Sequence, residues 1–177
     1  MLSAPIVITP PEGDVVDLEA VKTFLRVDSS ALDDEIAGYI RAAVTEIERI
    51  TSTRLAEQVV EIRADRFADL DHLTIGPVTG IVSIIYQSTS GTSETLVEES
   101  YELFGAGLET GIRPAFGHAW PAARGAAGVI AVQLEVGYSA ETQPASIDLA
   151  LKQLVRSKFD GTPFDLCTVL VNDRIWM

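Results

Sequence analysis

The sequence predicts an α+β fold, in which a small antiparallel β region is inserted between the second and third of three helices. Two periodicities carry this prediction. Apolar residues recur every three or four positions near residues 31–50 and 144–159, and they alternate with polar residues over parts of residues 57–138. The chain has 177 residues and an apolar content of 47%, which suits one domain with a real core. We expect this domain to cover residues 1–160.

The first two helices are predicted by their caps. A short helix is expected at about 17–25, because Asp17 suits its N-cap. A longer helix is expected at 31–50, with Ser30 as N-cap and Asp33 three residues later as in a capping box. Its apolar stripe consists of Leu32, Ile36, Ile40, Ala43, Val44, Ile47 and Ile50.

The third helix is expected at 144–159, because Pro144 suits a first turn and Gly161 ends the pattern. Residues 1–13 are expected to form an extended arm. Residues 161–177 are expected to form an extended tail, although they are apolar enough that packing on the chain's own core is an equal alternative.

Strand periodicity fills the middle of the chain, and the strongest pattern lies at the end of this region. Val129–Tyr138 alternates throughout, with Ile130, Val132, Leu134, Val136 and Tyr138 on one face. The other expected strands cover 57–66, 72–75, 81–87 and 94–97.

The stretch Tyr101–Pro121 is rich in glycine and proline, which favours turns. We expect a strand at Tyr101–Phe104, a turn through the glycines and a second strand near Ile112–Arg113. This stretch is then expected to present Phe116 and Trp120 to the helical part or to a neighbouring subunit.

The composition excludes several classes of protein. The net charge of −13, with a pI near 4.4, argues against a module that grips nucleic acid through basic patches. The single cysteine, Cys167, excludes an intramolecular disulfide and is expected to be buried and inert. No run approaches the roughly 18 apolar residues of a membrane helix, and no signal peptide is evident, so we expect a soluble protein made in a reducing cytoplasm.

No catalytic, cofactor or metal site is predicted. The two histidines, His72 and His118, lack the spacing of a metal motif, and neither belongs to a recognisable nucleophile constellation. The glycines from Gly105 to Gly111 are spaced wrongly for a dinucleotide fingerprint, and no helix pattern follows them. The expectation is a protein that is not an enzyme.

The order of segments resembles the head-tail connector, or adaptor, family of tailed bacteriophages and gene transfer agents. The resemblance runs over residues 14–159. It rests on Asp17-Leu-Glu-Ala-Val-Lys-Thr-Phe-Leu-Arg-Val-Asp28, Asp33-Asp-Glu-Ile36, Glu48-Arg-Ile-Thr-Ser-Thr-Arg54, Gly76-Pro-Val78, Tyr101-Glu-Leu103, Ile112-Arg-Pro114, Gly117, Trp120, Pro121 and Val132–Tyr138.

The resemblance implies a structural subunit of a virion or phage-like particle neck, assembled in the bacterial cytoplasm. It implies a ring of about twelve copies between the portal protein and a stopper or tail-completion protein. DNA would pass through the ring without sequence-specific binding, which fits the acidic composition.

Partner contacts are expected from two apolar segments, with the tail adding a strand to a partner's sheet through Thr168–Val171. The candidate contact residues are Phe116, Trp120, Phe164, Leu166, Thr168, Val169, Leu170, Val171, Ile175 and Trp176. The alternatives are another neck protein such as a stopper, a ligand- or peptide-binding module with a pocket near the glycine stretch, and, last, a hydrolase using His72 or His118.

Overall fold

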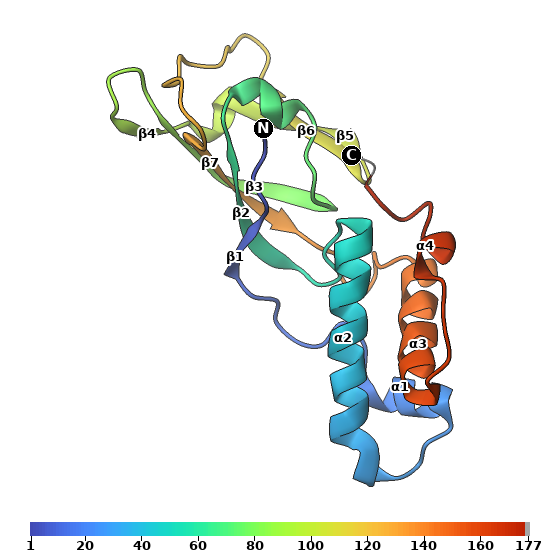
Figure 1. Cartoon of the computed structure of the whole chain (residues 1–177). Coiled ribbons are helices and arrows are strands. Elements are labelled where there is room, and N and C mark those ends of the chain that lie inside the picture. The colour runs from blue at the N-terminus through green and yellow to red at the C-terminus, as the bar shows by residue number, and fades with distance from the viewer. Residues whose placement is uncertain (176–177) are drawn as a thin grey trace.

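The computed structural model describes residues 1–175, and its mixed α+β composition and antiparallel sheet confirm the predicted fold class. Figure 1 shows an elongated molecule with the strands at one end and the helices at the other. The helices are α1 (Leu18–Leu25), α2 (Asp33–Thr51), α3 (Ala145–Asp160) and α4 (Leu166–Val169). No helix within residues 1–175 is both long enough and apolar enough to cross a membrane.

Five strands form one antiparallel sheet in the order β1-β2-β7-β3-β4. Their bounds are β1 (Ile6–Thr9), β2 (Gln58–Ala64), β7 (Ile130–Val136), β3 (Val78–Gln87) and β4 (Ser93–Thr95). The central strand β7 pairs with β2 on one side and with β3 on the other. Ile130, Val132, Leu134 and Val136 are each at most 1% exposed, so the alternation in the sequence identified the buried face of β7 correctly.

A separate hairpin, β5 (Tyr101–Ala106) and β6 (Glu109–Pro114), packs beside the short 3₁₀ helix η2 (Phe67–Asp71). Ile112 and Tyr101 belong to the same hydrophobic cluster as the buried face of the sheet. The Leu73 N–H donates to the carbonyl of Thr110 at 2.9 Å. The prediction of a strand at 72–75 is wrong, because these residues form irregular chain. Leu73 and Ile75 are nevertheless buried.

Two glycines make this hairpin fit, for different reasons. Gly105 has a φ of +92°, a conformation that residues with a side chain rarely adopt. Gly111 has no such φ, but a Cβ there would lie 2.1 Å from the carbonyl oxygen of Asp71. The glycine at 111 thus permits the close approach of η2 to β6.

The helices enclose a second hydrophobic cluster, in which α2 packs mainly against α3. Asp17 caps α1 as predicted, its carboxylate accepting from the Ala20 N–H at 3.1 Å. Lys22 on α1 is 5% exposed, and its Nζ lies 2.8 Å from Asp33 and 2.9 Å from Glu19. Hydrogen bonds to Asp33 and Glu19 raise the pKa of Lys22. This ion pair joins α1 to the first turn of α2.

The start of α2 differs from the prediction. The hydroxyl of Ser29 accepts from the Ala31 N–H at 3.1 Å and closes a 3₁₀ turn over Ser30–Leu32. The α-helix then begins at Asp33, without a side-chain cap at Leu32. The predicted capping box of Ser30 and Asp33 is therefore wrong. The hydroxyl of Ser29, one residue earlier, accepts from the free N–H at the start of the turn.

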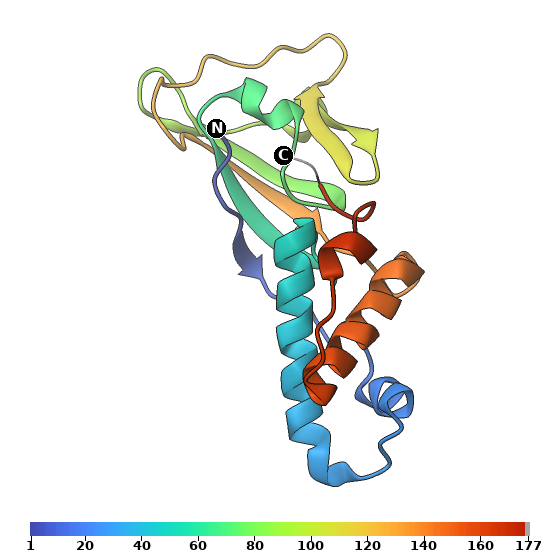
Figure 2. The ribbon, with the colours of Figure 1, turned by 45° about the vertical axis from the view of Figure 1, so that its right-hand side comes forward.

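Within residues 1–175, both terminal segments contact the rest of the chain. The N-terminal segment lies along the sheet, since β1 pairs with β2 and the Ser3 N–H donates to the Arg63 carbonyl at 2.8 Å. At the other end, α4 packs on the helical half together with Leu170, and the chain then runs toward the sheet half (Figure 2). The extended tail expected at 161–177 is wrong for the part described, and the alternative of a tail packed on its own core is correct for Leu166 and Leu170.

The N-terminus and the chain just before β7 meet at Asp65. One carboxylate oxygen accepts from the Gly128 N–H at 2.8 Å, and the other lies 3.3 Å from the Met1 ammonium. The same ammonium lies 2.5 Å from Asp69. The Gly128 hydrogen bond, with help from the ammonium, lowers the pKa of Asp65.

Leu170→Ala is expected to lower the free energy of unfolding by about 2–4 kcal/mol, because it leaves a cavity in the helical core. The matched control, Val171→Ala, truncates a neighbour that is 40% exposed and should cost less than about 1 kcal/mol. Urea unfolding followed by circular dichroism measures both. Equal, small losses would show that the tail does not pack as described.

Asp65→Asn is expected to destabilise the protein at neutral pH and to remove part of its acid sensitivity. A lowered carboxyl pKa stabilises the fold above the unfolded value, about 3.9. That contribution is lost as the pH falls through the folded value. The stability difference between wild type and variant should therefore shrink below about pH 4 in thermal melts across a pH series. Asp28→Asn, at an exposed position, is the control; a difference independent of pH would contradict the assignment.

Candidate functional site

The longest irregular segment of the sheet half is the loop 115–128, which runs from the end of β6 to β7 and is called here the connecting loop. It starts with a tight turn, in which the His118 N–H donates to the Ala115 carbonyl at 2.9 Å. Gly117 in this turn has a φ of +82°. Phe116 lies in the turn and is fully exposed.

The connecting loop is fixed by an aromatic stack. Trp120 lies face to face with Phe67 of η2, with 4.6 Å between ring centroids and 8° between ring planes. Phe67 also contacts Tyr86 of β3 edge to face at 5.6 Å. The expectation that Trp120 packs against the helical part is wrong, because its partner belongs to the core of the sheet half.

Further contacts hold the loop along its length. The Arg124 N–H donates to the Gln87 carbonyl at 2.9 Å, Ala123 bridges to Ser88, and the Gly128 N–H is bound by Asp65. The connecting loop therefore lies beside the turn 88–92 that joins β3 to β4, at the end of the molecule away from the helices (Figure 1). Phe116 is exposed, and the loop that carries it is anchored to the same chain at three later positions, Trp120, Ala123 and Gly128.

The predicted contact residues of the tail differ in their exposure. Leu166, Leu170 and Ile175 are 3%, 0% and 6% exposed, and the Ile175 N–H donates to the Thr51 carbonyl at 2.9 Å. These three residues are held by their own chain. Val169 and Val171 are 43% and 40% exposed. Thr168 is exposed, Phe164 is half-buried and Trp176 lies outside the described residues.

In the chain by itself, Leu166–Val169 is a helical turn. The strand expected at Thr168–Val171 on a partner's sheet stays a prediction, and it requires this turn to unwind. Asp165 caps this turn through the backbone N–H and the hydroxyl of Thr168, at 3.2 and 2.5 Å. The Thr168 hydroxyl is the main cause of a lowered pKa at Asp165. Cys167 is exposed rather than buried as expected, since it lies on the outer side of α4.

Neither histidine side chain has a hydrogen-bond or ion-pair partner among the residues described. His118 is exposed on the connecting loop, and His72 is exposed after η2. The carboxylate of Asp69, near His72 in sequence, accepts instead from the Met1 ammonium and the Arg66 backbone. Within residues 1–175, no group of three or more His, Cys, Asp or Glu side chains is placed to hold a metal ion.

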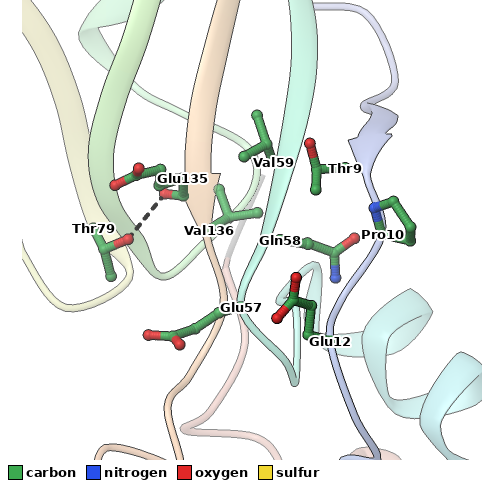
Figure 3. Close-up of a pocket in the computed structure, with 9 residues that line it drawn as sticks. All are labelled: Thr9, Pro10, Glu12, Glu57, Gln58, Val59, Thr79, Glu135 and Val136. Atoms are coloured by element: carbon green, nitrogen blue, oxygen red, sulfur yellow. Dashed lines mark hydrogen bonds between the residues drawn. The ribbon is translucent and has the colours of Figure 1, made fainter.

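A cavity of about 400 Å³ lies between the N-terminal arm and the ends of β2 and β7 (Figure 3). It is lined by Thr9, Pro10, Glu12, Glu57, Gln58, Val59, Thr79, Glu135 and Val136. Its charged lining residues are all glutamates, so it repels phosphate and other anions. No residue of Tyr101–Pro121 lines it, so it is not the pocket considered near the glycine stretch.

One exposed apolar element was missed in the sequence. Ile6, Val7 and Ile8 of β1 are 57%, 47% and 47% exposed at the edge of the sheet. The signal was present as a β-branched run, Ile-Val-Ile-Thr, bounded by Pro5 and Pro10. Strand β1 and the connecting loop are thus two exposed apolar features of the sheet half.

The fold resembles solved components of gene transfer agent (GTA) particles. One chain from the neck of an empty GTA particle, computed with C6 symmetry, superposes with a TM-score of 0.78 at 18% identity, covering 99% of this chain and 97% of that one. A chain from the virion of a native GTA particle gives the same TM-score and coverage at 19% identity. A chain from the neck of a native GTA particle, computed with C12 symmetry, gives 0.66 at 18% identity, with 96% of each chain covered.

The search of curated proteins found no match for this chain. The family model of the phage gp6-like head-tail connector protein matches residues 15–106, from before α1 to the end of β5. The match covers just over half of the chain, including the helix pair and the first half of the sheet. The chain belongs to the phage gp6-like head-tail connector family.

Proposed function

We propose that this protein is the adaptor subunit of a particle neck, where about twelve copies form a ring between the portal protein and the next neck component. Family membership makes it a structural connector of a phage-like particle. The observation that supports the ring proposal is the similarity of the whole fold to neck chains from particles computed with C6 and C12 symmetry. We place assembly of the neck in the bacterial cytoplasm.

The surface chemistry supports a passive channel for DNA. A protein that lines a channel without retaining the genome must not cluster Lys and Arg along it. This chain has 26 acidic and 13 basic residues, and many of the basic ones are paired with carboxylates. The cavity beside the N-terminal arm adds three glutamates and no cation.

The connecting loop is the proposed contact with a partner protein. An exposed aromatic side chain on an anchored loop is typical of an interface anchor, because it supplies a large contact area. Phe116 meets this description, whereas Trp120 supports the loop from within. On α4, Thr168, Val169 and Val171 remain proposed as a secondary contact.

The ring proposal is tested by co-expressing the chain with the portal protein of the same particle. Native mass spectrometry and negative-stain imaging then show whether a ring or a portal complex forms. A chain that stays monomeric with its portal present would overturn the proposal. A complex with a tail component but not with the portal would instead indicate a stopper.

Phe116→Ser is expected to weaken attachment to the partner by at least about tenfold, with the melting temperature unchanged, because the side chain is exposed in the free subunit. Co-purification with the portal and with the next neck component identifies the partner affected. Leu149→Ser on α3 is the matched control, since Leu149 is another exposed apolar residue, at 49%. Wild-type attachment to both partners would exclude Phe116 as an anchor.

The double variant His72→Ala/His118→Ala is expected to assemble as the wild type does, because both side chains are exposed and neither is required for a structural role. Particle yield and neck occupancy by electron microscopy measure this. Assays with general esterase and phosphatase substrates complete the test. A turnover in the wild type that the double variant lacks would favour the hydrolase alternative.

A further inference from the structure

The five-stranded sheet ends in two open edges. Strand β1 forms one edge and β4 forms the other, so each has one side without a strand partner in the chain described. An open edge presents a row of free backbone N–H and C=O groups, which can pair with a strand from another molecule. Soluble proteins usually protect such edges with charges, prolines or a covering element.

Edge β1 is only partly protected: it is four residues long, Pro5 and Pro10 flank it, and its register with β2 shifts between Val7 and Thr9. Within the strand, Ile6-Val-Ile-Thr9 has neither a charged residue nor a proline. All four residues are exposed, including three aliphatic side chains in succession. An edge of this kind pairs readily with another strand, because backbone hydrogen bonds and aliphatic contacts form together.

Edge β4 offers a complementary surface. The Leu96 N–H donates to Ile84 at 2.9 Å, so by alternation the backbone groups of Ser93 and Thr95 point away from β3. Exposed aliphatic side chains lie close by, because Ile85 is opposite Thr95 and is 38% exposed, and Val97 is 62% exposed. Both edges thus have free backbone groups with apolar side chains close by, although the side chains of β4 itself, Ser93, Glu94 and Thr95, are polar.

A second copy of this chain is the occupant that fits both edges at once. A ring of identical subunits needs two different, mutually complementary faces on each subunit. The opposite edges of one sheet supply such a pair. Strands β1 and β4 occupy the first and fifth positions of an antiparallel sheet, so they run in the same direction.

We propose that β1 of one subunit pairs in parallel with β4 of the next, so that the sheets continue around the ring. This inference rests on the proposed ring. It adds the segment that joins neighbouring subunits, and it separates that contact from the one made by Phe116. Phe116 then remains available for a different protein.

Cysteine cross-linking tests the pairing directly. In a Cys167→Ser background, Ile8→Cys and Thr95→Cys are introduced singly and together, and necks are formed with the portal. Paired strands lie about 4.8 Å apart, within disulfide range, and a short bismaleimide of roughly 7 Å tolerates a shift of two residues. The double variant should give a ladder of covalent multimers, and each single variant should stay monomeric on denaturing gels.

The outcomes distinguish this inference from the proposed function. Rings that form without a ladder would overturn the sheet-edge contact and leave the adaptor role intact. Dimers from Ile8→Cys alone would show β1 paired with β1, which also overturns it. If the wild-type chain forms no ring with its portal, the proposed function fails, and this inference fails with it.

Ile8→Lys provides a second test, because a lysine on an edge strand opposes strand addition. Ring formation should weaken by at least tenfold, while the melting temperature of the free subunit stays within two degrees of wild type. Leu149→Lys introduces the same charge at a similarly exposed residue outside the sheet and should leave the ring intact. Equal loss in both variants would contradict a role specific to β1.

Discussion

The structure depends on a buried polar junction at the C-terminal end of α2, where the helical half meets the sheet half. Thr51 and Thr53 are fully buried, and their hydroxyl oxygens lie 2.7 Å apart. The Thr51 carbonyl accepts from Ile175 of the tail. The Arg54 N–H donates to Gly76 at 2.8 Å, just before β3. Because buried polar groups must be paired, this junction fixes α2, the tail and the entry to β3 in one arrangement.

The junction explains why the two hydrophobic clusters act together although different segments build them. The cluster of the sheet half is built from β2, β3 and β7, with η2 and the β5–β6 hairpin over it. The helical cluster is built from α1, α2, α3 and the tail. The tail therefore belongs to the fold, and its buried leucines are unavailable to partners unless the helical half opens. Among the tail residues described, this leaves the exposed side chains around α4 for the secondary partner contact proposed above.

The features that could be predicted from the sequence are those set by local periodicity. The apolar stripe of α2 and the alternation of apolar and polar residues in β7 both predict the observed element, because each pattern repeats over many residues. The Asp17 cap and the Gly105–Gly107 turn follow from residue chemistry within a few positions. For strand β1 the sequence predicts only an extended arm, because four residues carry little periodicity and their partner, β2, lies fifty or more positions later.

The remaining errors have the same origin in long-range contacts. Trp120 stacks on Phe67, a residue more than fifty positions away, and no local pattern identifies such a pair. The sequence of the apolar tail is compatible with folding back on the chain or with extending outward. In the structure, Leu166 and Leu170 pack into the helical cluster, so the tail folds back. The family resemblance was correct because it drew on the order of segments, which records the topology indirectly. The exposed edge β1 came only from the structure.

The anchoring of the connecting loop has a consequence for the strength of binding. A partner that orders a flexible loop must oppose the loss of its conformational entropy, about 1–2 kcal/mol for each residue fixed. Here the Trp120 stack, the Ala123 bridge and the Gly128 hydrogen bond have already fixed much of the loop within the free subunit. For the partner contact proposed for Phe116, most of the contact energy would then appear as affinity. In the proposed ring the same contact would be repeated at every subunit, so that a modest single contact gives strong attachment through multivalency.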